Sequence, residues 1–127
     1  DHFKEINDHY GHKAGDVALQ KFSKMLQSSM RATDLSARYG GEEFAVFLPE
    51  TNTNDAQELA ERFRKQVSNL IIKLDDNKSV GFTISIGIAT YPINGTSIEE
   101  LICAADSALY IAKNAGRDRV MVAITDA

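Results

Sequence analysis

Two adjacent carboxylates near the middle of the chain are the residues with the clearest capacity for chemistry. Glu42 and Glu43 directly follow Gly40 and Gly41 and precede Phe44. At the start of a strand, neighbouring side chains project to opposite faces. A simple turn does not need two acids at this position. The pair is therefore a candidate acidic site.

The residues on both sides of the acidic pair predict a β-hairpin. Leu35 to Tyr39 and Phe44 to Leu48 are rich in β-branched, aromatic and aliphatic residues, as strands are. Gly-Gly is a strong hairpin-turn dipeptide. We expect the two carboxylates at the start of the second strand, with Phe44 as a core anchor.

Length and composition fit one globular domain. The chain has 127 residues, a formal net charge of -4 and 43% hydrophobic residues, enough for a core of ordinary size. The acidic balance argues against nucleic acid as a partner. No apolar run approaches the ~18 residues needed to cross a bilayer, and no signal peptide opens the chain. We expect a single cytoplasmic domain over residues 1–127, without membrane contact of its own.

The cysteine and the histidines give little sign of a redox or metal site. Cys103 is the single cysteine and lies in an apolar helical stretch, so we expect a buried thiol in a reducing compartment. The histidines fit no metal-ligand spacing and are interpreted as surface residues: His2, His9 and His12.

Residues 1–16 bring an amide and a carboxylate together. Apolar side chains at helical spacing predict one or two helical turns that Gly11 closes. Asn7 on this helix then faces Asp16 across a turn. Asp16 follows Gly15, where it can occupy the first turn of the next helix and interact favourably with the helix dipole. A purely structural role for Asp16 therefore stays open.

Two pairs of charged residues also have local structural explanations. Arg31 and Asp34 are spaced as an ion pair that has little stabilising value at a surface. Lys113 and Arg117 are neighbours near the predicted end of a helix, where cations offset the helix dipole.

Hydrophobic periodicity predicts the remaining elements. Apolar residues at three- and four-residue steps indicate amphipathic helices, and alternation of bulky and small residues indicates a strand. Ser97 with Glu100 fits a capping box at the start of the last helix, and Gly87 marks a close backbone approach. The predicted helices span 17–31, about 55–68 and 98–115, and the predicted strands span 70–74, 82–91 and 120–124.

Four blocks of residues occur in a recognisable order. The opening block fits DxFKxINDxYGHxxGD over residues 1–16, and RxxD follows at residues 31–34. Residues 40–44 read GGEEF, and ADxALYxAKxxGRxR fits residues 105–119. Together these blocks resemble the GGDEF-domain diguanylate cyclases, which condense two GTP into cyclic di-GMP. One departure is Asp118, which stands where the family commonly has Asn.

The resemblance implies an α+β fold. The expected architecture is a ferredoxin-like βαββαβ antiparallel sheet with helices on its faces, similar to nucleotide cyclase and polymerase palm domains. The first central strand of that sheet is expected to be missing from residues 1–127. We therefore expect a domain truncated at its N-terminus, or another segment that fills the gap. A metal-binding Asp of the family would precede Asp1 and is missing with the strand. Its absence can leave this form of the chain inactive.

The resemblance also assigns roles to the acidic hairpin and to a guanine site. Glu42 and Glu43 are the implied catalytic pair, with Glu42 as a ligand of two Mg²⁺ (or Mn²⁺) ions per active site. Asn7 and Asp16 are the implied guanine-binding residues, because a carboxylate accepts from N1–H and N2–H while an amide complements the acceptors. Glycines without side chains let the hairpin backbone approach the nucleotide, namely Gly40 and Gly41.

The same resemblance places phosphate contacts and a separate product site. Backbone amides and cations contact the substrate phosphates in the family. An RxxD motif with a supporting arginine binds the product and inhibits the enzyme. The phosphate contacts fall on His2, Phe3, Lys4, Lys113 and Arg117, and the inhibitory site on Arg31, Asp34 and Arg62.

The implied activity requires two copies of the domain. Each copy holds one GTP, and the 3′-OH of one attacks the α-phosphate of the other by two-metal phosphoryl transfer. We expect a homodimer controlled by an upstream sensory or regulatory domain, which could also tether it to a membrane. The alternative is a catalytically idle domain that senses cyclic di-GMP or GTP. A plain interaction domain would leave the polar residues unexplained.

Overall fold

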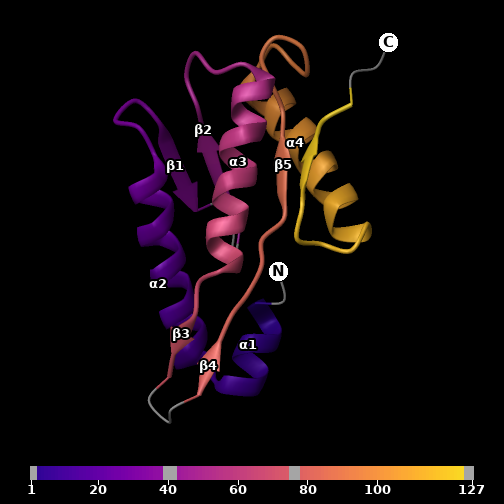
Figure 1. Ribbon diagram of the computed structural model, residues 1–127. Coiled ribbons are helices and arrows are strands. Elements are labelled where there is room, and N and C mark those ends of the chain that lie inside the picture. Colours follow the sequence, from indigo (N-terminus) through magenta and orange to yellow (C-terminus); the bar gives the residue numbers. More distant parts are fainter. Residues whose placement is uncertain (1–2, 39–42, 75–77, 125–127) are drawn as a thin grey trace. The chain divides into compact units, whose positions relative to one another are not determined.

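A computed structural model describes residues 3–38, 43–74 and 78–124 (Figure 1). The fold is α+β, as predicted. The chain divides into two compact units, each of which is described by itself: the α2 unit (His2–Glu50 and Val67–Phe82) and the α4 unit (Asp1, Thr51–Gln66 and Thr83–Ala127). The elements are α1 (Phe3–Tyr10), α2 (His12–Ser29), β1 (Leu35–Arg38), β2 (Phe44–Phe47), α3 (Thr53–Ser68), β3 (Ile72–Lys73), β4 (Ser79–Val80), β5 (Ile86–Ile88), α4 (Ile98–Asn114) and β6 (Val120–Val122).

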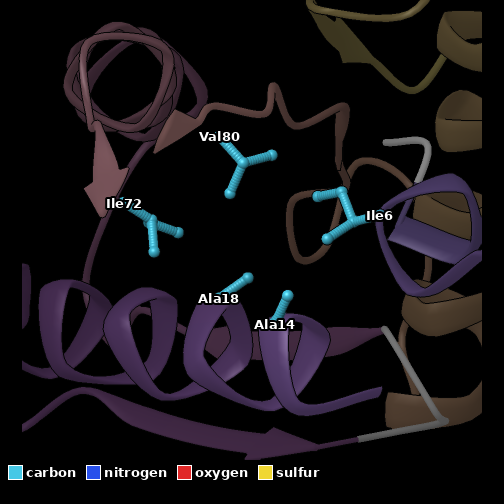
Figure 2. Close-up of a cluster of buried hydrophobic side chains, with 5 residues drawn as sticks. All are labelled: Ile6, Ala14, Ala18, Ile72 and Val80. Atoms are coloured by element: carbon cyan, nitrogen blue, oxygen red, sulfur yellow. The ribbon is translucent and has the colours of Figure 1, made fainter. Parts of the chain in front are cut away.

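The core of the α2 unit lies where α1, α2, β3 and β4 meet. Figure 2 shows five buried side chains from these elements pointing toward one another. Alanines at a four-residue step give α2 a narrow apolar face that its neighbours can approach closely. Burying one isoleucine stabilises a fold by roughly 1.5–3 kcal/mol. The cluster consists of Ile6, Ala14, Ala18, Ile72 and Val80.

The predicted hairpin forms from β1 and β2. The two strands are antiparallel, with Leu35 opposite Phe47 and Arg38 opposite Phe44. Phe44 is half-buried, and its ring packs on that of Phe22 from α2 with centroids 4.9 Å apart. Phe44 therefore packs on α2, but it is half-buried and is not one of the buried core residues. The predicted Gly-Gly turn lies outside the described residues.

In the α4 unit, β5 and β6 are parallel and pack on α4. Ile86 lies opposite Val120 in this pair. Gly87 faces the helix so closely that a Cβ atom there would be 2.1 Å from the Ala105 carbonyl oxygen and 2.6 Å from the Leu109 nitrogen. The close backbone approach predicted at Gly87 is confirmed.

Side-chain caps fix where α3 and α4 begin. At α4, the Ser97 hydroxyl accepts from the Glu100 N–H at 3.1 Å, and the Glu100 carboxylate accepts from the Thr96 N–H at 3.2 Å. The cap at Ser97 is thus confirmed, whereas the return bond of Glu100 goes to the residue before the cap and not to Ser97 as in the predicted capping box. At α3, the Asn52 side chain accepts from the Asp55 N–H at 2.8 Å. That helix starts earlier than predicted because Asn52 is the capping residue.

Strand pairing differs in detail from the predicted sheet. The described strands form three two-stranded ladders, of which β1–β2 and β3–β4 are antiparallel and β5–β6 is parallel. Within the predicted strand 82–91, the residues that pair are Ile86–Ile88. The missing first strand stays a prediction.

Cys103 is exposed, so the prediction of a buried thiol is wrong. The apolar side of α4 is marked by the buried residues Ala108 and Ala112. At 100° per residue, Cys103 lies about 140° around the helix from Ala108. Overall hydrophobicity of the stretch did not indicate which side the thiol occupies. Among the described helices, none has the length and hydropathy needed to cross a membrane.

Candidate active site

Asn7 packs against Gly15, the residue before Asp16 in α2. A Cβ atom on Gly15 would lie 1.7 Å from Oδ1 and 2.8 Å from Cγ of Asn7. The Asn7 amide therefore rests on the bare backbone of α2, one residue before Asp16. Asn7 is half-buried and Asp16 is exposed. Their role in guanine binding stays a prediction.

The link between α1 and α2 explains the position of Asp16. Gly11 has a φ of 90°, its N–H donates to the Asn7 carbonyl at 2.9 Å, and its carbonyl accepts from the Gly15 N–H at 3.3 Å. Because α2 already begins at His12, Asp16 falls in its second turn, and the first turn has no acidic residue. The helix dipole acts mainly within the first turn. The proposed structural role of Asp16 there is therefore wrong.

The start of α1 supplies backbone donors. Phe3 and Lys4 lie in the first turn of this helix, where N–H groups have no intrahelical acceptor. Such amides are well suited to phosphate oxygens. The Phe3 side chain packs partly buried against the core cluster, so it anchors these amides. His2 and the Lys4 side chain lie outside what the structure describes.

A closed turn holds Asp34 against Arg31. None of the Asp34 side chain is exposed, whereas 55% of the Arg31 side chain is. The carboxylate accepts from Nη2 of Arg31 at 3.0 Å and from the Arg31 backbone N–H at 2.8 Å. The Asp34 N–H donates back to the Arg31 carbonyl at 3.0 Å. Arg31 Nη2 also donates to the Pro49 carbonyl at 3.2 Å, which ties the turn to the end of the hairpin.

These contacts shift the pKa of both partners. The side-chain hydrogen bond from Arg31 lowers the pKa of the Asp34 carboxyl and raises the pKa of the guanidinium. Desolvation alone would raise the pKa of Asp34, so the hydrogen bond has the larger effect. Asp34 is consequently charged and engaged at neutral pH. Arg31 and Asp34 therefore form a closed turn in which the carboxylate is shielded from solvent, unlike an ion pair on an open surface.

The structure describes only part of the acidic hairpin. Glu43 is half-buried just before β2, and its carboxylate oxygens are donors of the kind that hard divalent cations prefer. Across residues 3–38, 43–74 and 78–124, no group of three or more acidic, histidine or cysteine side chains could hold a metal. Four predicted site residues lie outside those ranges, namely Gly40, Gly41 and Glu42 in the hairpin and His2 near the start of the chain.

Lys113 and Arg117 lie where α4 ends. The Arg117 N–H donates to the Ala112 carbonyl at 3.0 Å, which folds the chain back on the helix. Gly116, Arg117 and Asp118 are successive left-handed residues, with φ values of 121°, 65° and 48°. This conformation costs a residue with a side chain roughly 1–2 kcal/mol. Such strain concentrates at functional sites. Both predicted phosphate ligands are half-buried here.

The strained turn is attached to α3 by an arginine that sequence reasoning missed. Arg64 Nη1 donates to Asp118 Oδ1 at 2.6 Å. On its other edge, Arg64 donates to the Glu61 carboxylate from Nε at 3.1 Å and from Nη2. The pairing with Glu61, and then with Asp118, raises the pKa of Arg64. The spacing of Glu61 and Arg64 on a helix was a visible signal, but their link to Asp118 was not.

Arg62 has a different setting on α3. It is exposed and lines a shallow depression of about 560 Å³ along the solvent side of the helix. Arg62 belongs to the α4 unit, and the Arg31–Asp34 turn belongs to the α2 unit. The structure therefore leaves their common role in a product site untested. The other lining residues are Asn54, Gln57, Glu58, Glu61 and Lys65.

Comparison with known proteins identifies the family. The family model described as "Diguanylate cyclase, GGDEF domain" matches residues 1–119. The chain therefore belongs to the GGDEF-domain family. Its family assignment and its fold class, both predicted from the sequence, are confirmed.

Individual relatives agree with this assignment. The chain is 46% identical over 120 residues to diguanylate cyclase A of Treponema denticola, covering 94% of this chain and 32% of that protein. The GGDEF domain of PA1120 from Pseudomonas aeruginosa has a TM-score of 0.91 and 38% identity, covering 99% of this chain and 78% of that structure. The GGDEF domain of DgcB from Caulobacter crescentus, in complex with c-di-GMP, has a TM-score of 0.89 and 34% identity, covering 96% and 72%. The chain spans about a third of the length of the first curated relatives it matches.

Proposed function

We propose that the protein is a diguanylate cyclase that condenses two GTP into cyclic di-GMP and releases two pyrophosphates. The observation that carries the proposal is the contact of the Asn7 amide with Gly15, the residue that precedes Asp16 in α2. Similarity to the named cyclase of Treponema denticola supports the same activity.

Guanine recognition falls to Asn7 and Asp16. A carboxylate accepts from both N1–H and N2–H of guanine, whereas adenine has no matching pair of donors on that edge. The side-chain NH₂ of Asn7 donates to acceptor atoms of guanine. Packing against Gly15 holds the amide in one orientation, so little conformational entropy is lost when the base binds.

Phosphate binding falls to backbone amides and cations. The proposed donors to phosphate oxygens are the backbone amides of His2, Phe3 and Lys4, of which the last two lie in the first turn of α1. Lys113 and Arg117 add positive charge at the end of α4, where the rigid turn fixes the backbone of Arg117. Charge-assisted hydrogen bonds of this kind are stronger than neutral ones.

Glu42 and Glu43 form the acidic part of the active site. Glu42 is proposed as a ligand of divalent cations, two Mg²⁺ or Mn²⁺ per site, together with an upstream carboxylate. When bound, the cations lower the pKa of the ribose 3′-OH and stabilise the departing pyrophosphate. Glu43 orders this site or takes the 3′-OH proton. Gly40 and Gly41 leave room for the nucleotide beside them.

The reaction joins two nucleotides held by two copies of the domain. The 3′-oxygen of one GTP attacks the α-phosphorus of the other, the bond to the β-phosphate breaks, and pyrophosphate leaves. The 3′-oxygen of the second GTP then attacks the α-phosphorus of the first, which releases the second pyrophosphate and closes the ring. A homodimer is therefore required. An upstream sensory or regulatory segment is proposed to control it. Cyclic di-GMP is proposed to inhibit through Arg31 and Asp34, with Arg62 in support.

The test is direct measurement of product. The intact protein is incubated with GTP and Mg²⁺, and the nucleotides are separated by chromatography. We expect cyclic di-GMP and pyrophosphate in a ratio of about one to two, as the stoichiometry requires. ATP should give no cyclic product, because adenine lacks the N1–H and N2–H donors from which the Asp16 carboxylate would accept hydrogen bonds.

Glu43→Gln is the matched variant for this test. It keeps the size of the side chain and removes its charge, so GTP binding should persist while product formation falls by at least about 100-fold. Full activity in the folded variant would reject the acidic site. Absence of product from the wild-type protein, together with tight cyclic di-GMP binding, would instead indicate a receptor.

A further inference from the structure

One guanidinium connects α3 to the turn after α4. Arg64 donates from Nη1 to Asp118 and from its other edge to Glu61. Only 16% of the Arg64 side chain is exposed, against 43% for Asp118 and 40% for Glu61. A partly buried pair is screened by salt much less than an exposed one. We therefore expect salt to weaken the ion pair between Arg64 and Asp118 less than it weakens a fully exposed pair.

The backbone of Arg117 is fixed on both sides by separate contacts. Its N–H donates to the Ala112 carbonyl at 3.0 Å, and its carbonyl accepts from Nε of Arg119 at 2.9 Å. Asp118, the next residue, is held through its side chain by Arg64 at 2.6 Å. Arg117 and Asp118 both have left-handed φ values. This conformation is intrinsically unfavourable for Arg117 and less so for Asp118, whose short polar side chain tolerates it better. Contacts with the rest of the chain therefore help to maintain the turn.

We propose that Arg64 is a positioning residue for the substrate phosphates, because its contact with Asp118 maintains the left-handed turn from which Arg117 extends. The inference rests on the proposed function, in which Lys113 and Arg117 bind the phosphates of GTP. Glu61 orients the guanidinium of Arg64 so that Nη1 is directed at Asp118.

The geometry requires arginine at position 64. A guanidinium presents donors along two edges in a fixed plane, so it can bind Glu61 and Asp118 at once. Lysine has a single ammonium on a flexible chain and no planar fork. Arg64→Lys should therefore keep the charge and lose much of the positioning.

The test compares ligands that differ only in their phosphates. The affinities of the intact protein for GTP and for guanosine are measured by calorimetry in EDTA, which prevents turnover. Arg64→Ala should weaken GTP binding about 10-fold and leave guanosine binding unchanged, because Asn7 and Asp16 are not affected. General destabilisation would weaken both ligands together.

Variants at position 118 provide the rescue. Asp118→Asn keeps the acceptor oxygen, so GTP affinity should stay within about 3-fold of wild type. Asp118→Ala removes the acceptor and should match Arg64→Ala, and the double variant should be no worse than either single one. Lys65→Ala, which removes a neighbouring cation from α3, is the control and should bind GTP normally.

The outcomes separate this inference from the proposed function. Unchanged GTP affinity in Arg64→Ala, or additive losses in the double variant, would overturn the positioning role while Arg117→Ala still weakened GTP binding. Normal GTP affinity in Arg117→Ala would overturn the phosphate assignment itself, and the role of Arg64 with it.

Discussion

Gly15 lies inside α2, where alanine would ordinarily stabilise a helix by about 1 kcal/mol. Here a Cβ would meet Asn7 Oδ1 at 1.7 Å, and the short Asn7 side chain is the part that can move. Gly15→Ala should therefore change the free energy of unfolding by less than about 1 kcal/mol, since the helical gain offsets the clash. GTP affinity should fall about 10-fold because the amide is displaced.

Asn7→Ala is the matched variant for Gly15. Both changes remove the same amide from its place, so the double variant should bind GTP no more weakly than Asn7→Ala alone. Calorimetry with GTP in EDTA measures the affinities, and urea unfolding reports stability. Wild-type affinity in Gly15→Ala would show that the position of Asn7 does not matter for binding.

The Asp34 carboxyl links stability to pH. Its pKa is lowered in the folded protein by the hydrogen bond from Arg31, relative to about 3.9 in an unfolded chain. Between these two values the unfolded chain binds more protons, so the contribution to stability is present above about pH 4 and is lost as pH falls through the folded pKa. Asp34→Asn should remove this dependence.

Urea unfolding between pH 2.5 and 7 measures the effect of Asp34. Wild-type stability should fall more steeply than that of Asp34→Asn below about pH 4, by at most the slope of one proton. The two curves should run parallel at higher pH. Glu61, whose pKa is also lowered by its arginine partner, is present in both proteins and cancels. Parallel curves over the whole range would contradict the ion pair of the buried Asp34 carboxylate with Arg31.

At the scale of elements, Gly87 sets how closely β5 approaches α4. A Cβ there would collide with backbone atoms of Ala105 and Leu109, which cannot move without shifting the helix. Gly87→Ala should lower the free energy of unfolding by about 1–3 kcal/mol. Gly81→Ala is the control, because its nearest contact would be Leu70 O at an ordinary 3.5 Å, and it should be neutral or slightly stabilising. Equal urea midpoints for the two variants would contradict this packing.

Periodicity predicted the helices and the hairpin because each depends on neighbours along the chain. The same reasoning selected Asn7 and Asp16 as site residues. It did not predict the start of α2, because Gly15 suggested a break where the helix in fact continues. The pair Arg64–Asp118 joins residues 54 positions apart, and no local pattern encodes that distance. The complete burial of the Asp34 side chain could not be predicted for a similar reason. The RxxD spacing identifies Arg31 as the partner of Asp34, but it does not show that the carboxylate is shielded from solvent.

At the scale of the whole molecule, the proposed reaction depends on encounter between two chains. Each copy presents one GTP, and neither new phosphodiester bond can form without the 3′-OH held by the other copy. The rate of cyclic di-GMP formation should therefore rise with about the square of protein concentration below the dimer dissociation constant, as mass action requires. GTP binding per chain, measured over the same dilution series, should stay constant because one copy holds one nucleotide. Specific activity that does not change over a 100-fold dilution, with the protein monomeric throughout, would mean that one chain completes the reaction and would reject the paired-site mechanism.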